Sequence, residues 1–175
     1  EQAGAARAKL ESLLSRGLPL RDALSCAEAI GDPALIPWIL EVMAPLEHRR
    51  IAAETFRAIT GVDIAGRLST TRPDEAPQTP SDDPTDDDVT PDPDEPLAWP
   101  DVDAIKREWL TRRSGLRDGT RYLLGKEREP AWLAEVVRLG RQRCRASAAL
   151  DLALSARGPL FDVTARAAHQ SSALR

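Results

Sequence analysis

The chain has 175 residues, of which 42% are hydrophobic and 4% aromatic, and its formal net charge is −4. This composition is sufficient for one core and favours helices over sheet. No apolar run approaches the ~20 residues of a membrane span and no signal peptide is visible, so we expect a cytoplasmic protein.

The N-terminal residues predict two helices. Residues 3–14 are rich in Ala and Leu, and residues 18–30 carry apolar side chains at helical spacing up to Gly31. The second segment is typical of the second helix of a helix pair. Because the chain begins at Glu1, we expect it to be a piece of a longer protein, with its first helices packed on a preceding repeat.

Residues 31–61 predict two antiparallel helices with a sharp turn between them. Asp32 is suited to cap the first helix, and Pro33 to occupy its first position. Pro37 predicts a mild kink inside that helix, and Pro45 ends it. The second helix runs from about residue 46 to 60 and ends at Gly61.

Residues 67–98 predict a long, largely irregular, acidic and proline-rich insertion. Between residues 73 and 103 there are twelve acidic residues, eight prolines and no Lys or Arg. Such a segment forms neither a helix nor a central strand. Trp99 is interpreted either as a clasp that pins the end of the insertion or as an exposed contact residue.

The aspartates of the insertion raise a calcium hypothesis, since calcium prefers several carboxylate oxygens. Asp86, Asp87 and Asp88 are the densest run. The spacing and central glycine of an EF-hand are absent, so we expect a solvated acidic loop and no metal site.

Residues 99–175 predict a C-terminal helical region, as residues 1–66 predict an N-terminal one. Helices are expected at about 101–113, 130–139 and 141–156, with a further packed element near Phe161. Residues 121–125 are a short apolar element that is either a strand or a helical turn.

The first helix pair recurs near the C-terminus after a shift of 94 positions. Trp38, Arg49, Ala52 and Phe56 become Trp132, Arg143, Ala146 and Leu150. Stacked repeats of helix pairs form solenoids. We therefore predict an all-α fold of stacked antiparallel helix pairs, a HEAT-like solenoid interrupted by the acidic insertion. Its expected core anchors are Trp38, Phe56, Trp132 and Leu150.

Several features resemble HEAT repeats: the proline inside the first helix, the arginine that opens the second (Arg49, Arg143), and the small residue three positions later. The aspartate usual in the turn of such repeats is missing, since Pro45 and Gly140 stand near that place. The resemblance is therefore to a divergent form, in which Arg49 and Arg143 are expected to pair within the solenoid.

A wider set of motifs runs through the chain: Gly31-Asp32-Pro33, Ile59-Thr60-Gly61, Asp86-Asp87-Asp88, Trp99-Pro100, Arg121-Tyr122-Leu123-Leu124-Gly125 and Gly140-Arg141-Gln142-Arg143. This set resembles a little-characterised family of bacterial HEAT-repeat proteins, often encoded near type VI secretion genes. The resemblance covers most of residues 18–165 and implies the C-terminal part of a longer protein. It implies no catalytic residues and no cofactor.

Charge is strongly separated along the chain, because residues 104–175 carry fifteen basic and seven acidic residues. Arg138, Arg141 and Arg145 are spaced to share a helix face. One interpretation is that the acidic insertion docks on this face. The other is that the face binds an anionic partner, with the insertion as competitor.

No catalytic signature is present, so we expect a protein that is not an enzyme. His48 and His169 are the two histidines, and His48 has no ligand partner four positions further along its helix. Cys26 and Cys144 match no zinc or disulfide framework and are expected to be reduced thiols. A cleft formed by Glu54, Arg143 and Asp151 would reopen the question of catalysis.

The function predicted from sequence is a scaffold or adaptor that binds a protein, in a type VI secretion context and with a partner from the same operon. The expected contact residues are Arg138, Arg141, Arg145, Trp99 and Asp86–Asp88. The alternative is a nucleic-acid-binding HEAT-like protein that uses the basic C-terminal helix face. The overall acidity and the absence of interleaved aromatic residues argue against that alternative.

Overall fold

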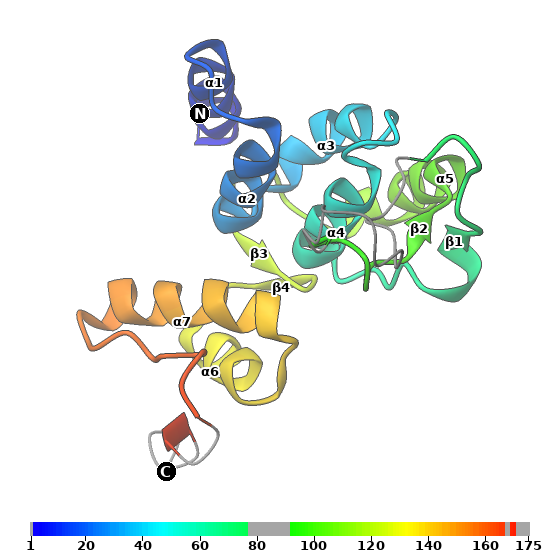
Figure 1. Ribbon diagram of the computed structural model, residues 1–175. Coiled ribbons are helices and arrows are strands. Elements are labelled where there is room, and N and C mark those ends of the chain that lie inside the picture. The colour runs from blue at the N-terminus through cyan, green and yellow to red at the C-terminus, as the bar shows by residue number, and fades with distance from the viewer. Residues whose placement is uncertain (1, 77–91, 167–168, 171–175) are drawn as a thin grey trace.

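The computed structural model describes residues 2–76, 92–166 and 169–170, and the chain is mostly helical. Figure 1 shows an upper body of helices, a short hairpin below it, and a pair of helices beneath the hairpin. No helix within the described residues has the length and apolar character needed to cross a membrane.

The upper body contains the first five helices. They are α1 (Gln2–Ser15), α2 (Leu20–Ile30), α3 (Ile36–Val42), α4 (Arg49–Thr60) and α5 (Val102–Arg112). Helix α4 is central, since α2 and α3 pack against it and every residue from 51 to 60 is buried. Phe56 is fully buried and meets the ring of Trp109 from α5 edge to face, with the ring centroids 6.3 Å apart.

The start of α3 follows capping chemistry. The Asp32 carboxylate accepts a hydrogen bond from the Ala34 amide, and a 3₁₀ turn, η1 (Pro33–Leu35), precedes the helix. Pro37 therefore lies in the first turn of α3, where its missing N–H costs nothing. The predicted kink inside a longer helix is wrong for this reason. The second helix of the pair also begins later than predicted, at Arg49.

The acidic insertion leaves and re-enters the fold at one place. Strand β1 (Ser69–Thr70) pairs antiparallel with β2 (Trp99–Pro100), after the 3₁₀ turn η2 (Gly66–Leu68). The prediction that residues 67–98 are largely irregular falls partly on residues 77–91, which lie outside the described part of the chain.

A tight hairpin joins the upper body to the lower helices, after the 3₁₀ turn η3 (Arg113–Gly115). Strands β3 (Tyr122–Leu123) and β4 (Lys126–Glu127) are connected by Leu124 and Gly125, which both have positive φ. This is the backbone of a two-residue hairpin turn. The element that the sequence left open between strand and helical turn is therefore a strand.

The hairpin binds the C-terminal ends of two helices, where backbone carbonyls lack helical partners. The amides of Leu124 and Gly125 donate to the carbonyls of Ala58 and Ile59 at the end of α4. The Tyr122 amide donates to the carbonyl of Gly31, which ends α2. The hairpin thus fixes the ends of α2 and α4 side by side.

The lower pair consists of α6 (Pro130–Leu139) and α7 (Gln142–Ala156). It forms a second, smaller core with Leu123, in which Val136, Cys144 and Ala148 are buried. Trp132 is partly buried against this core, as Trp38 is against the first.

Two predictions about the core differ from the structure. Leu150 is 48% exposed, because α7 buries only the face that meets α6 and the hairpin, whereas α4 is enclosed on all sides. Helix α5, assigned by sequence to the C-terminal region 99–175, packs in the first core through Ile105 and Trp109. The two cores divide at the hairpin and not at the acidic insertion.

Candidate functional site

A cleft of ≈ 490 Å³ opens between α2 and α7, with Ile51 of α4 also in its wall. We call it the helix cleft. In Figure 1, α2 lies above the hairpin and α7 below it. One wall is charged, and the α7 wall is partly apolar through Ala146, Leu150 and Leu154.

Asp151 organises the charged wall of the helix cleft. Its carboxylate accepts hydrogen bonds from Arg121, at 2.9 and 3.1 Å, and from Arg128, at 2.6 Å. The Arg128 side chain is only 3% exposed and also donates to Ser147 and to the Glu28 carbonyl. Both arginines therefore tie α7 to the end of α2, and their positive charge suits the carboxyl end of a helix.

Glu28 of α2 places a carboxyl group with a raised pKa in the helix cleft. Burial, reinforced by the nearby Glu54 carboxylate, raises the pKa of Glu28 to about 7. Part of this rise in pKa is offset by the positive charges of Arg128, Arg57 and Arg143, which lower it. A carboxyl group with such a pKa can accept or release a proton at physiological pH.

A second hollow, of ≈ 230 Å³, lies between α4 and residues 96–98 of the insertion. Glu54 lines it and is held by Arg57 through two hydrogen bonds of 2.8 and 2.6 Å. The hydrogen bonds that Arg57 donates to the Glu54 carboxylate raise the pKa of Arg57, and burial raises the pKa of the neighbouring Cys144 thiol. Cys144 therefore stays a neutral thiol and lacks the thiolate character of a nucleophile.

The three residues whose convergence would suggest catalysis are thus divided between the two hollows. Arg143 and Asp151 line the helix cleft, and Glu54 lines the neighbouring one. The Asp151 and Glu54 carboxylates each form ion pairs with arginine side chains of the chain, so neither is available as an unpaired base.

Three arginines from different helices converge on the end of the acidic insertion. We call Arg21 of α2, Arg50 of α4 and Arg143 of α7 the arginine cradle. Arg21 binds both carboxylate oxygens of Asp94, at 2.7 and 2.8 Å. Arg50 donates to the Asp94 carbonyl, at 2.9 Å, and to the Asp92 carboxylate, while Arg143 donates to the Pro93 carbonyl at 2.7 Å.

The bound residues form a compact turn. The Asp94 amide donates to the side chain of Asp92, and the Leu97 amide donates to the Asp94 carbonyl. Asp94 is 5% exposed, and Arg50 also stacks 4.6 Å over the ring of Trp99. Trp99 is partly buried and lies at the re-entry of the insertion.

The basic residues selected from sequence do not form one helix face. Arg138 is in the last turn of α6, Arg141 precedes α7, and Arg145 is inside α7, because Gly140 separates the two helices. Arg145 donates to the Val137 carbonyl and to Gln142. The described end of the insertion docks on the arginine cradle instead, and Arg143 contacts it there. Asp86, Asp87 and Asp88 lie outside the described residues.

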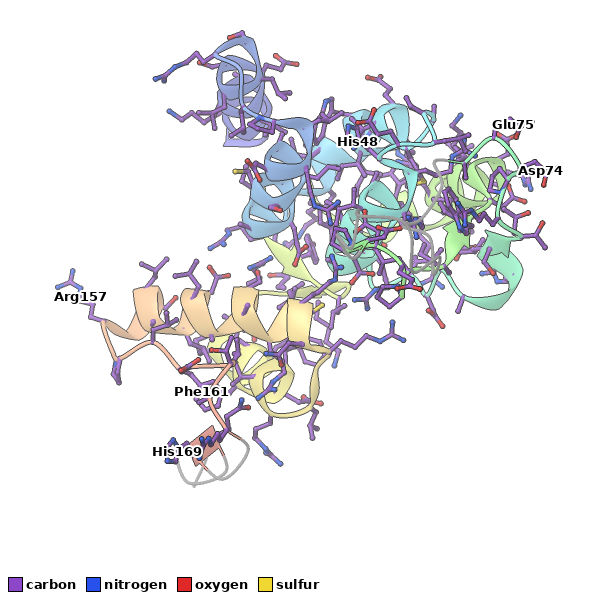
Figure 2. The ribbon with its side chains drawn as sticks, in the orientation of Figure 1. His48, Asp74, Glu75, Arg157, Phe161 and His169 are labelled. Atoms are coloured by element: carbon purple, nitrogen blue, oxygen red, sulfur yellow. The ribbon has the colours of Figure 1, made fainter. Side chains whose placement is uncertain are left out.

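The histidines do not form a site together. Figure 2 shows His48 beside α3 in the upper body and His169 at the opposite end, below α7. The described residues contain no group of three or more His, Cys, Asp or Glu side chains suited to hold a metal ion.

Sequence reasoning missed Arg21 and Arg50. Each lies in a helix that gives no local signal of anion binding, and Arg21 is 73 positions from its partner Asp94. The charge imbalance between the insertion and the rest of the chain indicated that basic residues would bind the insertion. Identifying which arginines do so requires knowledge of how α2, α4 and α7 pack.

Comparison of the chain with protein-family models, curated proteins and solved structures found no match.

Proposed function

We propose that this chain is a non-catalytic scaffold or adaptor built from HEAT-like helix pairs, which binds a protein partner on the face formed by α2, α4 and α7. The helix cleft is the observation that carries this proposal. Its α7 wall leaves Leu150 and Leu154 48% and 69% exposed beside the buried Arg128–Asp151 ion pair. Uncovered apolar side chains next to a fixed polar frame are typical of protein-binding surfaces.

The solenoid interpretation is supported by parallels between α3–α4 and α6–α7. Arg49 donates to the Met43 carbonyl in the first pair, and Arg145 donates to the Val137 carbonyl in the second. Ala52 and Ala53 are buried in α4, as Ala148 and Ala149 are in α7. These correspondences need a shift of 96 positions in the second helix, two more than the ungapped shift that selected Leu150.

The two extra positions in the second helix of the pair come from the region where α6 connects to α7. Helix α6 continues to Leu139, and only Gly140 and Arg141 link it to α7. Arg145 therefore takes the place that Arg49 has in the first pair. Arg143 is then not part of the turn between the helices, and it donates to the Pro93 carbonyl in the insertion.

The second helices of the pairs would form the inner surface of such a solenoid. Helices α2, α4 and α7 all line the helix cleft, in agreement with the use that solenoids make of their concave face. A type VI secretion context, with a cytoplasmic partner from the same operon, is the biological setting we propose. It is supported only by the motif resemblance, three motifs of which (residues 31–33, 59–61 and 121–125) meet at the hairpin.

The proposal is tested by affinity capture from the source bacterium with the tagged chain and a Leu150→Glu/Leu154→Glu variant. The matched control is Leu110→Glu, which alters a 67% exposed leucine on α5. We expect a protein that is recovered by the wild type and the control and lost with the double variant. Calorimetry with the purified partner should then give at least tenfold weaker binding for the double variant.

Two outcomes would contradict this function. Equal recovery with all three baits would place the partner elsewhere on the molecule. Recovery of nucleic acid in place of protein, lost on replacing Arg138, Arg141 and Arg145 by alanine, would favour the nucleic-acid alternative, whose affinity should fall steeply with salt.

A further inference from the structure

The arginine cradle is occupied by the chain's own insertion. Its three arginines come from three helices, yet they bind three successive residues, Asp92 to Asp94. Two of their contacts go to main-chain carbonyls and the others to carboxylates. This combination recognises a short acidic peptide in a turn and not an isolated charge.

The three helices that carry the cradle are held in place by contacts that do not involve residues 92–94. Helices α2 and α4 are fixed side by side by the hairpin, and the Arg121–Asp151 and Arg128–Asp151 pairs fix α7 against them. Arg50 is further oriented by the Trp99 ring. Fixed helices keep the three arginines close together, so binding a peptide does not require the backbone of the site to be ordered.

The bound segment is held chiefly by charge. Pro93, Glu95 and Pro96 are exposed, so apart from the buried Asp94 carboxylate the segment contributes little to the core. The Arg21 and Arg143 side chains are 39% and 37% exposed. Ion pairs at this exposure are weak and screened by salt, so a competing acidic segment can displace this one.

The cradle is also continuous with the helix cleft. Arg143 lines the cleft and donates to Pro93 at the same time. A ligand on the cradle that extends along α7 would reach Leu150 and Leu154, which the described part of the insertion leaves exposed. A partner can therefore gain apolar contacts that the tethered segment does not make.

We propose that the arginine cradle binds an acidic Asp-x-Asp segment of a protein partner, and that Asp92-Pro93-Asp94 is an intramolecular competitor for the same site. The inference rests on the proposed function, since it assigns the partner class and the regulation of the α2–α4–α7 face. A tethered competitor acts at a high effective concentration, so it lowers the apparent affinity of any partner until it is released.

The test measures trans binding of a labelled peptide with the sequence of residues 90–99, by fluorescence anisotropy, to the full chain. Asp92→Asn/Asp94→Asn removes the two docked charges. Its matched control is Asp74→Asn/Glu75→Gln, which removes two charges from the other end of the insertion. Figure 2 shows both of these side chains pointing outward at the edge of the molecule remote from α7.

We expect the Asp92→Asn/Asp94→Asn variant to bind the peptide at least tenfold more tightly than the wild type, and the control to match the wild type. Adding Arg50→Ala and Arg143→Ala should remove this gain. Asp92→Asn alone keeps the Arg21–Asp94 pair, so it should fold normally and show a smaller gain. Circular dichroism and thermal unfolding confirm that each variant is folded.

Equal peptide binding by the wild type and both Asp92 variants would overturn the inference and leave the scaffold proposal standing. Displacement of the peptide by a single-stranded oligonucleotide, as effectively as by unlabelled peptide, would also overturn it, because the cradle would then be a general polyanion site. The scaffold proposal is tested separately, by the affinity-capture experiment with the Leu150→Glu/Leu154→Glu variant.

Discussion

Asp32 connects two parts of the chain through a single carboxylate oxygen. Its Oδ1 accepts from the Ala34 amide, which caps η1, and from the Gly119 amide, 87 positions away. Asp151 has the same role between α7 and the hairpin. In each case one carboxylate positions a segment that is distant in the sequence, so its loss should free that segment.

Replacement of Asp151 by alanine should destabilise the protein by about 3 kcal/mol, because it leaves the Arg128 guanidinium buried without its counter-ion. Asp118→Ala, at an exposed aspartate, should change the free energy of unfolding by less than about 0.5 kcal/mol. Urea denaturation measures both. An equal, small effect of the two substitutions would show that the Asp151 pairs do not hold α7 in place.

Glu28 should make stability depend on pH in the direction opposite to most carboxylates. Its pKa is raised from the ordinary value of 4.5 to about 7, so the folded state binds the proton more tightly than the unfolded state. Stability from this group is therefore present below about pH 4.5 and is lost as the pH rises to about 7. The cause is burial beside Glu54, which disfavours the ionised form.

Comparison with Glu28→Gln isolates this effect. Relative to the variant, the wild type should lose roughly 3 kcal/mol between pH 4.5 and 8, at about 1.4 kcal/mol per unit of pKa. Urea denaturation across this range provides the measurement, with Glu135→Gln, at an exposed position of α6, as the control. A pH-independent difference between wild type and Glu28→Gln would show that the Glu28 carboxyl is solvated.

At the scale of elements, Gly61 is required both by its backbone and by its neighbour. It ends α4 with φ of 71°, and a Cβ there would lie 2.4 Å from the Leu124 carbonyl oxygen. Gly66 has a similar φ of 73°, but nothing lies within 4 Å of the corresponding Cβ. Substitutions at these two glycines therefore distinguish the free-energy cost of backbone strain from the cost of the close approach of the hairpin.

Gly66→Ala should cost about 1–2 kcal/mol, the penalty for a left-handed residue with a side chain. Gly61→Ala should cost about 1–3 kcal/mol more, because the hairpin must move away from α4. Thermal and urea unfolding of the two variants give the difference directly. Equal costs would indicate that the hairpin does not dock tightly on the end of α4.

Sequence reasoning succeeded at these helix ends because the chemistry is local. Asp32 and Pro33 at a helix start, and Gly31 and Gly61 at helix ends, follow from capping preferences that involve a few adjacent residues. The hairpin was left undecided because its turn places Leu124 at φ of 52°, where asparagine or glycine is usual. Two hydrogen bonds from the turn to α4 hold this backbone, and they are long-range contacts.

The same division between local and long-range information applies to α7. Its helical pattern was visible, but the sequence did not indicate that only one face would be covered. The ungapped repeat selected Leu150 as a core residue, whereas the longer α6 shifts the buried positions to Ala148 and Ala149. The arginine cradle could not be predicted from the sequence for a related reason, since its members are adjacent only after α2, α4 and α7 have packed.

At the scale of the whole molecule, the hairpin makes two unequal cores depend on each other. Neighbouring residues of a strand point to opposite faces, so Tyr122 packs in the first core and Leu123 in the second. The second core has few large side chains and is formed by one helix pair. Segments of that size do not reach stability alone, so α6 and α7 depend on the docked hairpin for their fold.

This dependence predicts a single cooperative thermal transition for the wild-type chain and a divided one when the hairpin is displaced. Scanning calorimetry should give equal calorimetric and van't Hoff enthalpies for the wild type. In Gly61→Ala, α6 and α7 should melt first, whereas Gly66→Ala should keep one transition at a lower temperature. Two transitions in the wild type would mean that the hairpin links the two cores without coupling them, and the α2–α4–α7 face would then not be a rigid surface.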